Sequence, residues 1–155
     1  MMTRCAIRRA WPLWRLAFAI LAGGCAADGA PPQAVSLDAP RTCADAFGAA
    51  VAYWNEAGVA LDVVPTGGDI QVTAIPNDGD DVVGATIVQA GNPTRVQVET
   101  CAGAIGRQTM THELGHALGL IAHSPDRANL MHARTDGTNW NLDDAQRATV
   151  IAGRD

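Results

Sequence analysis

The chain has 155 residues, which is enough for one compact domain once a targeting segment is set aside. Its formal net charge is −5, and all eleven of its basic residues are arginines. Four of these arginines lie in the first 24 residues, so the rest of the chain has a balance of 7 − 16 = −9. Such an acidic surface excludes nucleic acid and anionic lipid headgroups from the expected partners.

The first 24 residues are predicted to be a signal peptide. Four arginines (Arg4, Arg8, Arg9 and Arg15) precede an apolar run over residues 16–22, which is too short to span a bilayer. The run ends in Leu21-Ala22-Gly23-Gly24-Cys25, which resembles a bacterial lipoprotein cleavage box. We therefore expect export to the cell envelope and a lipid anchor on Cys25, with Ala26 favouring the outer membrane. Release into the periplasm or the medium after ordinary cleavage is the alternative.

Residues 25–40, rich in Ala, Gly, Pro and Asp, are predicted to be a flexible tether, and a single domain is expected over residues 41–155. Apolar residues at helical spacing predict a first helix over 43–57, ended by Gly58. Four β-rich runs follow at 61–64, 70–75, 82–89 and 95–100. A helix is expected over about 106–118 and a closing helix over 142–151, with Asn141 as its cap. This order predicts an α+β fold with a mixed sheet.

The segment Asn77-Asp78-Gly79-Asp80-Asp81 allows two interpretations. Its carboxylates have the chemistry of a calcium site, but Asn, Asp and Gly are also the residues that turns prefer. We expect a simple turn here rather than bound calcium.

The segment from His112 to His123 has the chemistry of a metal site. An HExxH pattern on a helix puts His112 and His116 on one face, so both imidazoles reach one ion at roughly 2.0–2.1 Å. Glu113 lies beside the first histidine, where it can act as general base for an attacking water. Gly119 can adopt a positive φ, which lets the helix end and the chain turn back toward His123. Three of the four histidines of the chain fall in this segment, which argues against ordinary core histidines.

The pattern resembles the signature of the metzincin clan of zinc peptidases, and within it the matrixin-like enzymes. Their HExxHxxGxxH segment is followed by a Met-turn, and here Met131 follows His123 at the usual interval, 131 − 123 = 8. The family places its third histidine six residues after the second, whereas the interval here is 123 − 116 = 7. One inserted residue within 120–122 can be absorbed by a loop beyond the helix. The resemblance therefore implies a small metzincin-like catalytic domain in which His112, His116 and His123 hold one catalytic Zn²⁺.

Other donors remain open at the third position. His132 is the first alternative to His123, and Asp126 is the second. Thermolysin-like enzymes complete the site with a downstream glutamate, but none follows Glu113, which excludes that class. An aspartate-completed site stays open through Asp126, Asp136, Asp143 or Asp144, although the motif that surrounds such sites is missing. Some metzincins use a tyrosine after the Met-turn, but Tyr53, the single tyrosine of the chain, lies far upstream.

These features predict a zinc-dependent endopeptidase that acts on protein or peptide substrates. Glu113 would take a proton from the attacking water and return it to the leaving amine. The unusual interval between His116 and His123 motivates an alternative, a zinc-binding but non-catalytic surface lipoprotein that binds peptides or envelope components. A third interpretation is a small lipoprotein whose histidines only stabilise the fold. In each case we expect a monomer.

The resemblance also implies a place for substrate. In metzincins an edge strand before the active-site helix pairs with extended substrate, and the runs 82–89 and 95–100 are the candidates here. Trp140, downstream of the Met-turn, either lines the pocket for the residue after the scissile bond or packs in the core.

The cysteines can be sorted by compartment. If Cys5 leaves with the signal peptide and Cys25 carries lipid, Cys43 and Cys101 remain as a pair. In an exported protein this pair favours a disulfide, which would link the first helix to the segment before the zinc helix and contribute about 2–4 kcal/mol. An alternative is that Cys43 acts like the zinc-binding propeptide cysteine of matrixins.

Overall fold

A computed structural model describes residues 32–77 and 83–152. The predicted signal peptide, the lipidation site at Cys25 and most of the Asn77–Asp81 segment lie outside the described residues. Within the described ranges, no helix is both long enough and apolar enough to cross a membrane.

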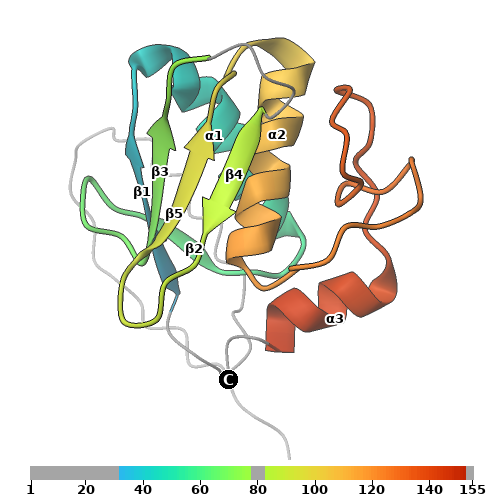
Figure 1. The fold of residues 1–155 in the computed structure, drawn as a ribbon. Coiled ribbons are helices and arrows are strands. Elements are labelled where there is room, and N and C mark those ends of the chain that lie inside the picture. The colour runs from blue at the N-terminus through green and yellow to red at the C-terminus, as the bar shows by residue number, and fades with distance from the viewer. Residues whose placement is uncertain (1–31, 78–82, 153–155) are drawn as a thin grey trace, which may run out of the picture.

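A five-stranded mixed sheet forms one layer of the domain (Figure 1). Its strands are β1 (Gln33–Asp38), β2 (Leu61–Val63), β3 (Ile70–Ala74), β4 (Gly84–Ile87) and β5 (Thr94–Val98). They are arranged in the spatial order β2-β1-β3-β5-β4. All neighbouring pairs are parallel except β4 and β5, so the one antiparallel strand, β4, forms an edge of the sheet. This arrangement confirms the predicted α+β class.

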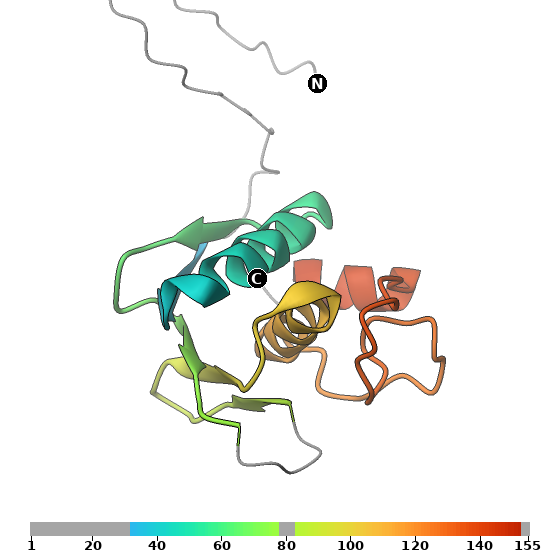
Figure 2. The same ribbon diagram turned by 90° about the horizontal axis from the view of Figure 1, so that it is seen from above.

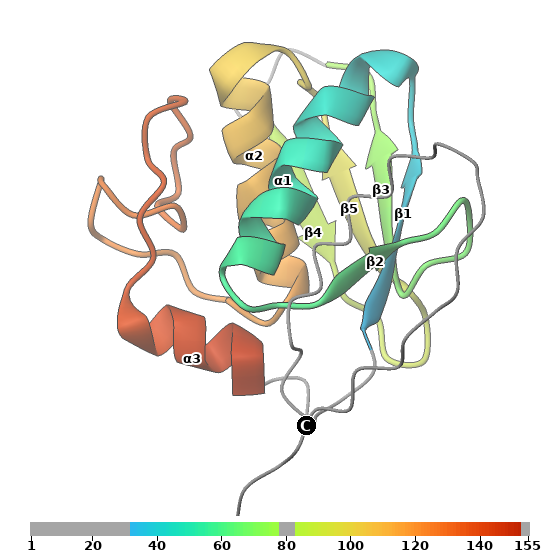
Figure 3. The same cartoon turned by 180° about the vertical axis from the view of Figure 1, so that it is seen from behind.

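Two long helices, α1 (Ala44–Glu56) and α2 (Gly103–Ala117), lie side by side on one face of the sheet (Figures 2 and 3). A 3-10 turn, η1 (Arg41–Cys43), precedes α1, and α3 (Asp144–Ala152) closes the described chain. The core lies between helices and sheet, where Trp54 of α1 packs with apolar residues of every layer, including Val35, Val72 and Leu114. The long connection from α2 to α3 lies beside α2, on the side opposite α1 (Figures 2 and 3).

The prediction of a flexible tether over residues 25–40 is wrong where β1 lies. The strand occupies residues 33–38 and pairs with β2 on one side and β3 on the other. Val35 is fully buried in the core, so this segment is part of the domain. The prediction failed because the strand carries only a short, weakly alternating apolar signal, and the Pro- and Gly-rich residues before it dominated the composition.

The cap of α3 also differs from the prediction. Asp143, rather than Asn141, caps the helix: the N–H of Gln146 donates to Asp143 Oδ1 at 2.7 Å, and the N–H of Asp143 donates to Gln146 Oε1 at 3.1 Å. This is a reciprocal capping box. Asn141 instead forms a bridge with Asn129, and its carbonyl accepts from the N–H of Leu130 at 2.7 Å. The other predicted helices and strands occur in the predicted order.

The predicted disulfide between Cys43 and Cys101 is present. It joins the turn that precedes α1 to the residue two positions before α2, with a sequence separation of 58. Since Cys43 is bonded to Cys101 and is absent from the histidine group, its interpretation as a zinc-binding propeptide cysteine is wrong. A second link between the helices is the Trp54 indole N–H, which donates to the carbonyl of Thr111 at 3.0 Å.

Candidate metal centre

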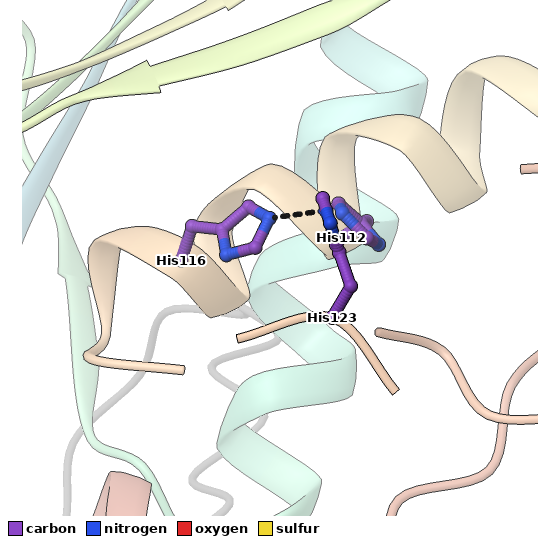
Figure 4. A group of neighbouring side chains, drawn as sticks. All are labelled: His112, His116 and His123. Carbon is purple, nitrogen blue, oxygen red and sulfur yellow. Dashed lines mark hydrogen bonds between the residues drawn. The ribbon is translucent and has the colours of Figure 1, made fainter. Parts of the chain in front are cut away.

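Three histidines converge at the C-terminal end of α2. His112 and His116 project from the helix one turn apart, and His123 approaches them from the following loop (Figure 4). Each ring offers one nitrogen to the cluster, and these three nitrogens all lie within 4.8 Å of one another. The Nε2 atoms of His116 and His123 are 3.2 Å apart. Two nitrogens at about 2.0–2.1 Å from a tetrahedral zinc would be separated by about 3.3–3.4 Å, so the cluster fits one such ion.

The loop after α2 brings His123 back to the helix. Gly119 has a φ of 102°, a conformation that favours glycine, and it reverses the chain. The N–H of Leu120 then donates to the carbonyl of Gly115 at 3.0 Å, and that of Ile121 to Gly119 at 3.0 Å. The loop therefore accommodates the extra residue expected within 120–122, and His123 still joins the cluster.

Backbone carbonyls fix the two helical imidazoles. The Nδ1 atom of His112 lies 2.8 Å from the carbonyl oxygen of Leu130, and that of His116 lies 2.6 Å from the carbonyl oxygen of Leu120. A carbonyl can only accept, so each Nδ1 carries a hydrogen and each Nε2 keeps a free lone pair for a metal. Burial lowers the pKa of His112 to about 4, so this imidazole is neutral near pH 7.

Met131 forms the floor beneath this part of α2. It is fully buried, and a Cβ added at Gly115 would lie 2.7 Å from its sulfur and 2.9 Å from Trp54 Cζ2. Asn129 holds the turn: its Oδ1 accepts from the N–H of Met131 at 2.8 Å, and its Nδ2 donates to Gln146 Oε1 at 2.8 Å. Asn129 was not singled out from the sequence, because an asparagine in an irregular segment has no periodic signal to mark it as buried.

Glu113 is seated against the edge strand β4. The Thr86 hydroxyl lies 2.8 Å from Glu113 Oε2 and also 2.8 Å from the Glu113 carbonyl oxygen, so it can donate to either acceptor. A Cβ at Gly84 would lie 2.9 Å from Glu113 Cγ, so glycine makes room for the side chain. Burial raises the pKa of the Glu113 carboxyl, and the Thr86 hydroxyl opposes that rise. Thr86 and Gly84 could not be found from the sequence, because their role depends on which strand lies beside α2.

A cleft of about 300 Å³ opens between β4 and the loop after α2. The residues that line it come from both sides: Gly84, Ala85, Thr86, Val88, Glu113, His116, Ile121 and His123. Of the two predicted candidates for an edge strand, β4 is at the edge and β5 is interior. The Glu99 N–H donates to the Val83 carbonyl at 3.0 Å. Residues that bond to the partner strand alternate with residues that do not in an antiparallel pair, so the N–H and carbonyl groups of Gly84 and Thr86 point away from β5, toward the open edge.

The other predicted donors are outside the histidine group and have local roles. Asp126 Oδ1 accepts from the N–H of Ala128 at 2.9 Å, and Asp136 Oδ1 accepts from the N–H of Thr138 at 2.9 Å. Asp143 caps α3, and Asp144 is the first residue of that helix. His132 Nδ1 lies 3.2 Å from the N–H of Arg134.

Trp140 belongs to the packing of the domain rather than to the cleft. Its ring is half-buried against the core, and its indole N–H donates to the Gly137 carbonyl at 3.3 Å. Its carbonyl accepts from the Tyr53 hydroxyl at 2.7 Å. Trp140 is not among the residues that line the cleft, so the packing interpretation is the one that fits.

Comparisons with known proteins bear on the fold alone. No protein-family model matches the sequence, and no curated protein matches it. Among solved structures, the fold is similar to a chain of the GM1-bound form of the ECX AB5 holotoxin, with a TM-score of 0.52. The two share 14% sequence identity over 79% of this chain and 80% of that chain.

Proposed function

We propose that this domain is a zinc-dependent endopeptidase of the metzincin type, with matrixin-like features. One observation carries the proposal: the carboxylate of Glu113 and the imidazoles of His116 and His123 line one cleft, and His112 completes the donor group. A nucleophile-activating base beside a shared metal position is the arrangement that metal-assisted hydrolysis requires. The buried Met131 beneath α2 and the edge strand beside it support the same assignment.

The donor set fits zinc. Three imidazoles, two of them oriented through Nδ1 by backbone carbonyls, would leave a four-coordinate cation one open position, as in catalytic zinc sites. When bound, zinc supplies Lewis acidity toward a carbonyl oxygen and makes water a nucleophile near neutral pH.

The residues of the chain then divide the remaining work. Glu113 accepts a proton from the water that attacks the peptide carbonyl, and it returns the proton to the leaving amine. The Thr86 hydroxyl holds the carboxylate in place. The outward backbone groups of Gly84 and Thr86 offer hydrogen bonds to an extended peptide, which would add a strand to the sheet.

We further propose that the substrate is a protein or peptide and that the enzyme works as a monomer outside the cytoplasm. The disulfide supports export, because such bonds persist in oxidising compartments.

Attachment through a lipid on Cys25 remains part of this proposal. Metabolic labelling with a radioactive or alkyne fatty acid, with Cys25→Ala as control, tests it.

The decisive experiment compares Glu113→Gln with the native chain. We expect the variant to bind one zinc per chain and to lose hydrolysis of a generic protein substrate by at least about 100-fold, since general-base catalysis contributes about 10²–10⁴-fold. Glu56→Gln, on the exposed face of α1, is the matched control and should keep full activity. A chelator should abolish the native activity, and added zinc should restore it.

The outcomes separate the three interpretations of the sequence. Stoichiometric zinc without cleavage of varied substrates would favour the non-catalytic zinc-binding lipoprotein. Absence of bound zinc would favour histidines that only stabilise the fold. Near-native turnover by zinc-loaded Glu113→Gln protein would overturn the assigned role of this carboxylate.

A further inference from the structure

Thr86 belongs to two surfaces of the molecule at once. Its hydroxyl oxygen lies on the helix face of the sheet, 2.8 Å from Glu113 Oε2 and 2.8 Å from the Glu113 carbonyl oxygen. Its own N–H and carbonyl lie at the open edge of β4, because residues at this position of the ladder do not bond to β5. The side chain of Thr86 therefore contacts the proposed general base, while its backbone faces the place that an extended peptide would occupy.

The edge strand β4 is held mainly by its pairing with β5. Its four residues, Gly84–Ile87, are all at least partly exposed, whereas Val96 and Val98 of β5 are fully buried. A strand that has one neighbour and buries little apolar surface belongs to the less stable part of a fold. A peptide added along the outer edge would give β4 a second neighbour and would fix its position.

The position of β4 affects the orientation of the Glu113 carboxylate. A glutamate side chain has several rotatable bonds, and the Thr86 hydroxyl bridges the carboxylate and the backbone carbonyl of this residue. The strand and α2 also approach closely, since a Cβ added at Gly84 would lie 2.9 Å from Glu113 Cγ. A shift of β4 would therefore move the carboxylate, and a misplacement of about 1 Å can cost about 100-fold in rate.

We propose that Thr86 is a positioning residue that couples peptide pairing on β4 to the orientation of the Glu113 carboxylate. This inference rests on the endopeptidase function proposed above, and it adds control of that site by its own substrate. A peptide that pairs along the edge fixes β4, and the Thr86 hydroxyl then holds the carboxylate in one orientation. Binding energy from parts of the peptide remote from the scissile bond therefore raises kcat instead of only lowering KM.

The test is a double-mutant cycle between the strand and the substrate. Two capped peptides share one sequence from a denatured protein substrate, and cleavage is followed at the central amide. In one of them, every other amide carries an N-methyl group in place of its hydrogen, so these amides cannot donate to β4. For the native protein we expect kcat for the methylated peptide to be at least about 10-fold lower, within the cost of misplacing a catalytic group.

The substitution Thr86→Val removes the hydroxyl through which the edge acts on Glu113. In this variant kcat for the two peptides should differ by less than about twofold, the limit of additive behaviour. The difference in KM should remain, because the backbone of β4 is unchanged. Thr86→Ser keeps a hydroxyl and should restore the native difference in kcat.

The same substitution on an interior strand is the matched control. Thr73 lies on β3 and does not line the cleft, so Thr73→Val should keep the native kcat and KM for both peptides. Zinc content and thermal unfolding of all variants should stay close to native, which separates positioning from loss of the site or of the fold.

A second readout does not depend on turnover. Glu113→Gln places a side-chain amide beside the Thr86 hydroxyl, and nitrogen NMR of this amide reports whether the side chain is held. In zinc-loaded Glu113→Gln protein, saturation with the unmethylated peptide should shift the amide signal and slow its hydrogen exchange. The methylated peptide should leave the signal unchanged, and Thr86→Val added to this variant should remove the response.

The outcomes distinguish this coupling from the endopeptidase function itself. If Thr86→Val lowered kcat for both peptides by the same factor, Thr86 would hold Glu113 whether or not the edge is occupied, and the coupling would be overturned. An amide signal that does not respond to the unmethylated peptide would overturn it as well. If the native protein cleaved no peptide, the endopeptidase proposal would fail, while NMR with the same two peptides would still decide the coupling.

Discussion

His112 and His123 enter the same cluster from two different kinds of structure. His112 is 4% exposed, lies within α2 and is fixed by the Leu130 carbonyl, next to the buried Met131. His123 is exposed and lies on a loop that Gly119 turns back toward the helix. The helix side of the site is thus part of the hydrophobic core, whereas the loop side is fixed by a few backbone hydrogen bonds. Stability and metal binding should therefore respond differently to changes on the two sides.

The largest effect should come from removing the Cys43–Cys101 disulfide, which anchors the helix side. The bond closes a long loop, so Cys43→Ser with Cys101→Ser should lower the free energy of unfolding by about 2–4 kcal/mol. His112 lies about 13 Å along α2 from the start of the helix, so zinc affinity of the folded protein should stay close to native. Urea unfolding and zinc titration measure the two quantities.

Reduction of the native protein supplies the control for this variant. A thiol reductant should reproduce the loss of stability without any substitution. A double variant as stable as the oxidised native protein would mean that the disulfide does not anchor the helix side.

The next effect compares the two histidines directly. His112→Ala leaves the buried Leu130 carbonyl without its partner, so the metal-free protein should lose about 1–3 kcal/mol of unfolding free energy. His123→Ala removes an exposed side chain and should change the same quantity by less than about 0.5 kcal/mol. Both variants should lose at least about 100-fold in zinc affinity. Removing a group that only hydrogen-bonds to a metal ligand costs up to about 100-fold, and removing a ligand should cost at least as much. Equal stability losses in the two variants would remove the distinction between the sides.

A smaller effect tests the close contact between α2 and Met131. In Gly115→Ala the added methyl would meet the Met131 sulfur at 2.7 Å, and overpacking of this kind costs about 1–3 kcal/mol, against a gain of about 1 kcal/mol in helix propensity. Gly48→Ala in α1 is the matched control, because nothing lies within 4 Å of its added methyl. We expect the control to raise stability by about 0.5–1 kcal/mol and Gly115→Ala to lower it, as measured by urea unfolding.

The same comparison explains what the sequence could predict. Helical periodicity fixes the relation of His112, Glu113 and His116 within α2, and it needs no knowledge of the rest of the fold. The contact between Thr86 and Glu113 depends on which strand pairs at the sheet edge and in which register, which no local pattern specifies. β1 was missed for a related reason, because its burial comes from neighbours distant in the sequence.

The cap of α3 is a different case, because a local signal was available. Asp143 and Gln146 have the three-residue spacing of a capping box, and this pair identifies the cap better than Asn141 alone.

The smallest expected effect concerns His132, the alternative third ligand. Its Nδ1 lies 3.2 Å from the backbone nitrogen and 3.3 Å from the carbonyl oxygen of Arg134, and the ring lies outside the group formed by His112, His116 and His123. His132→Ala should therefore change zinc affinity by no more than about twofold, the range of an ordinary surface substitution of about 0.5 kcal/mol. A chelator-competition assay with His123→Ala alongside measures the contrast. If His132→Ala lost zinc and His123→Ala kept it, the loop side of the site would belong to the segment after Met131.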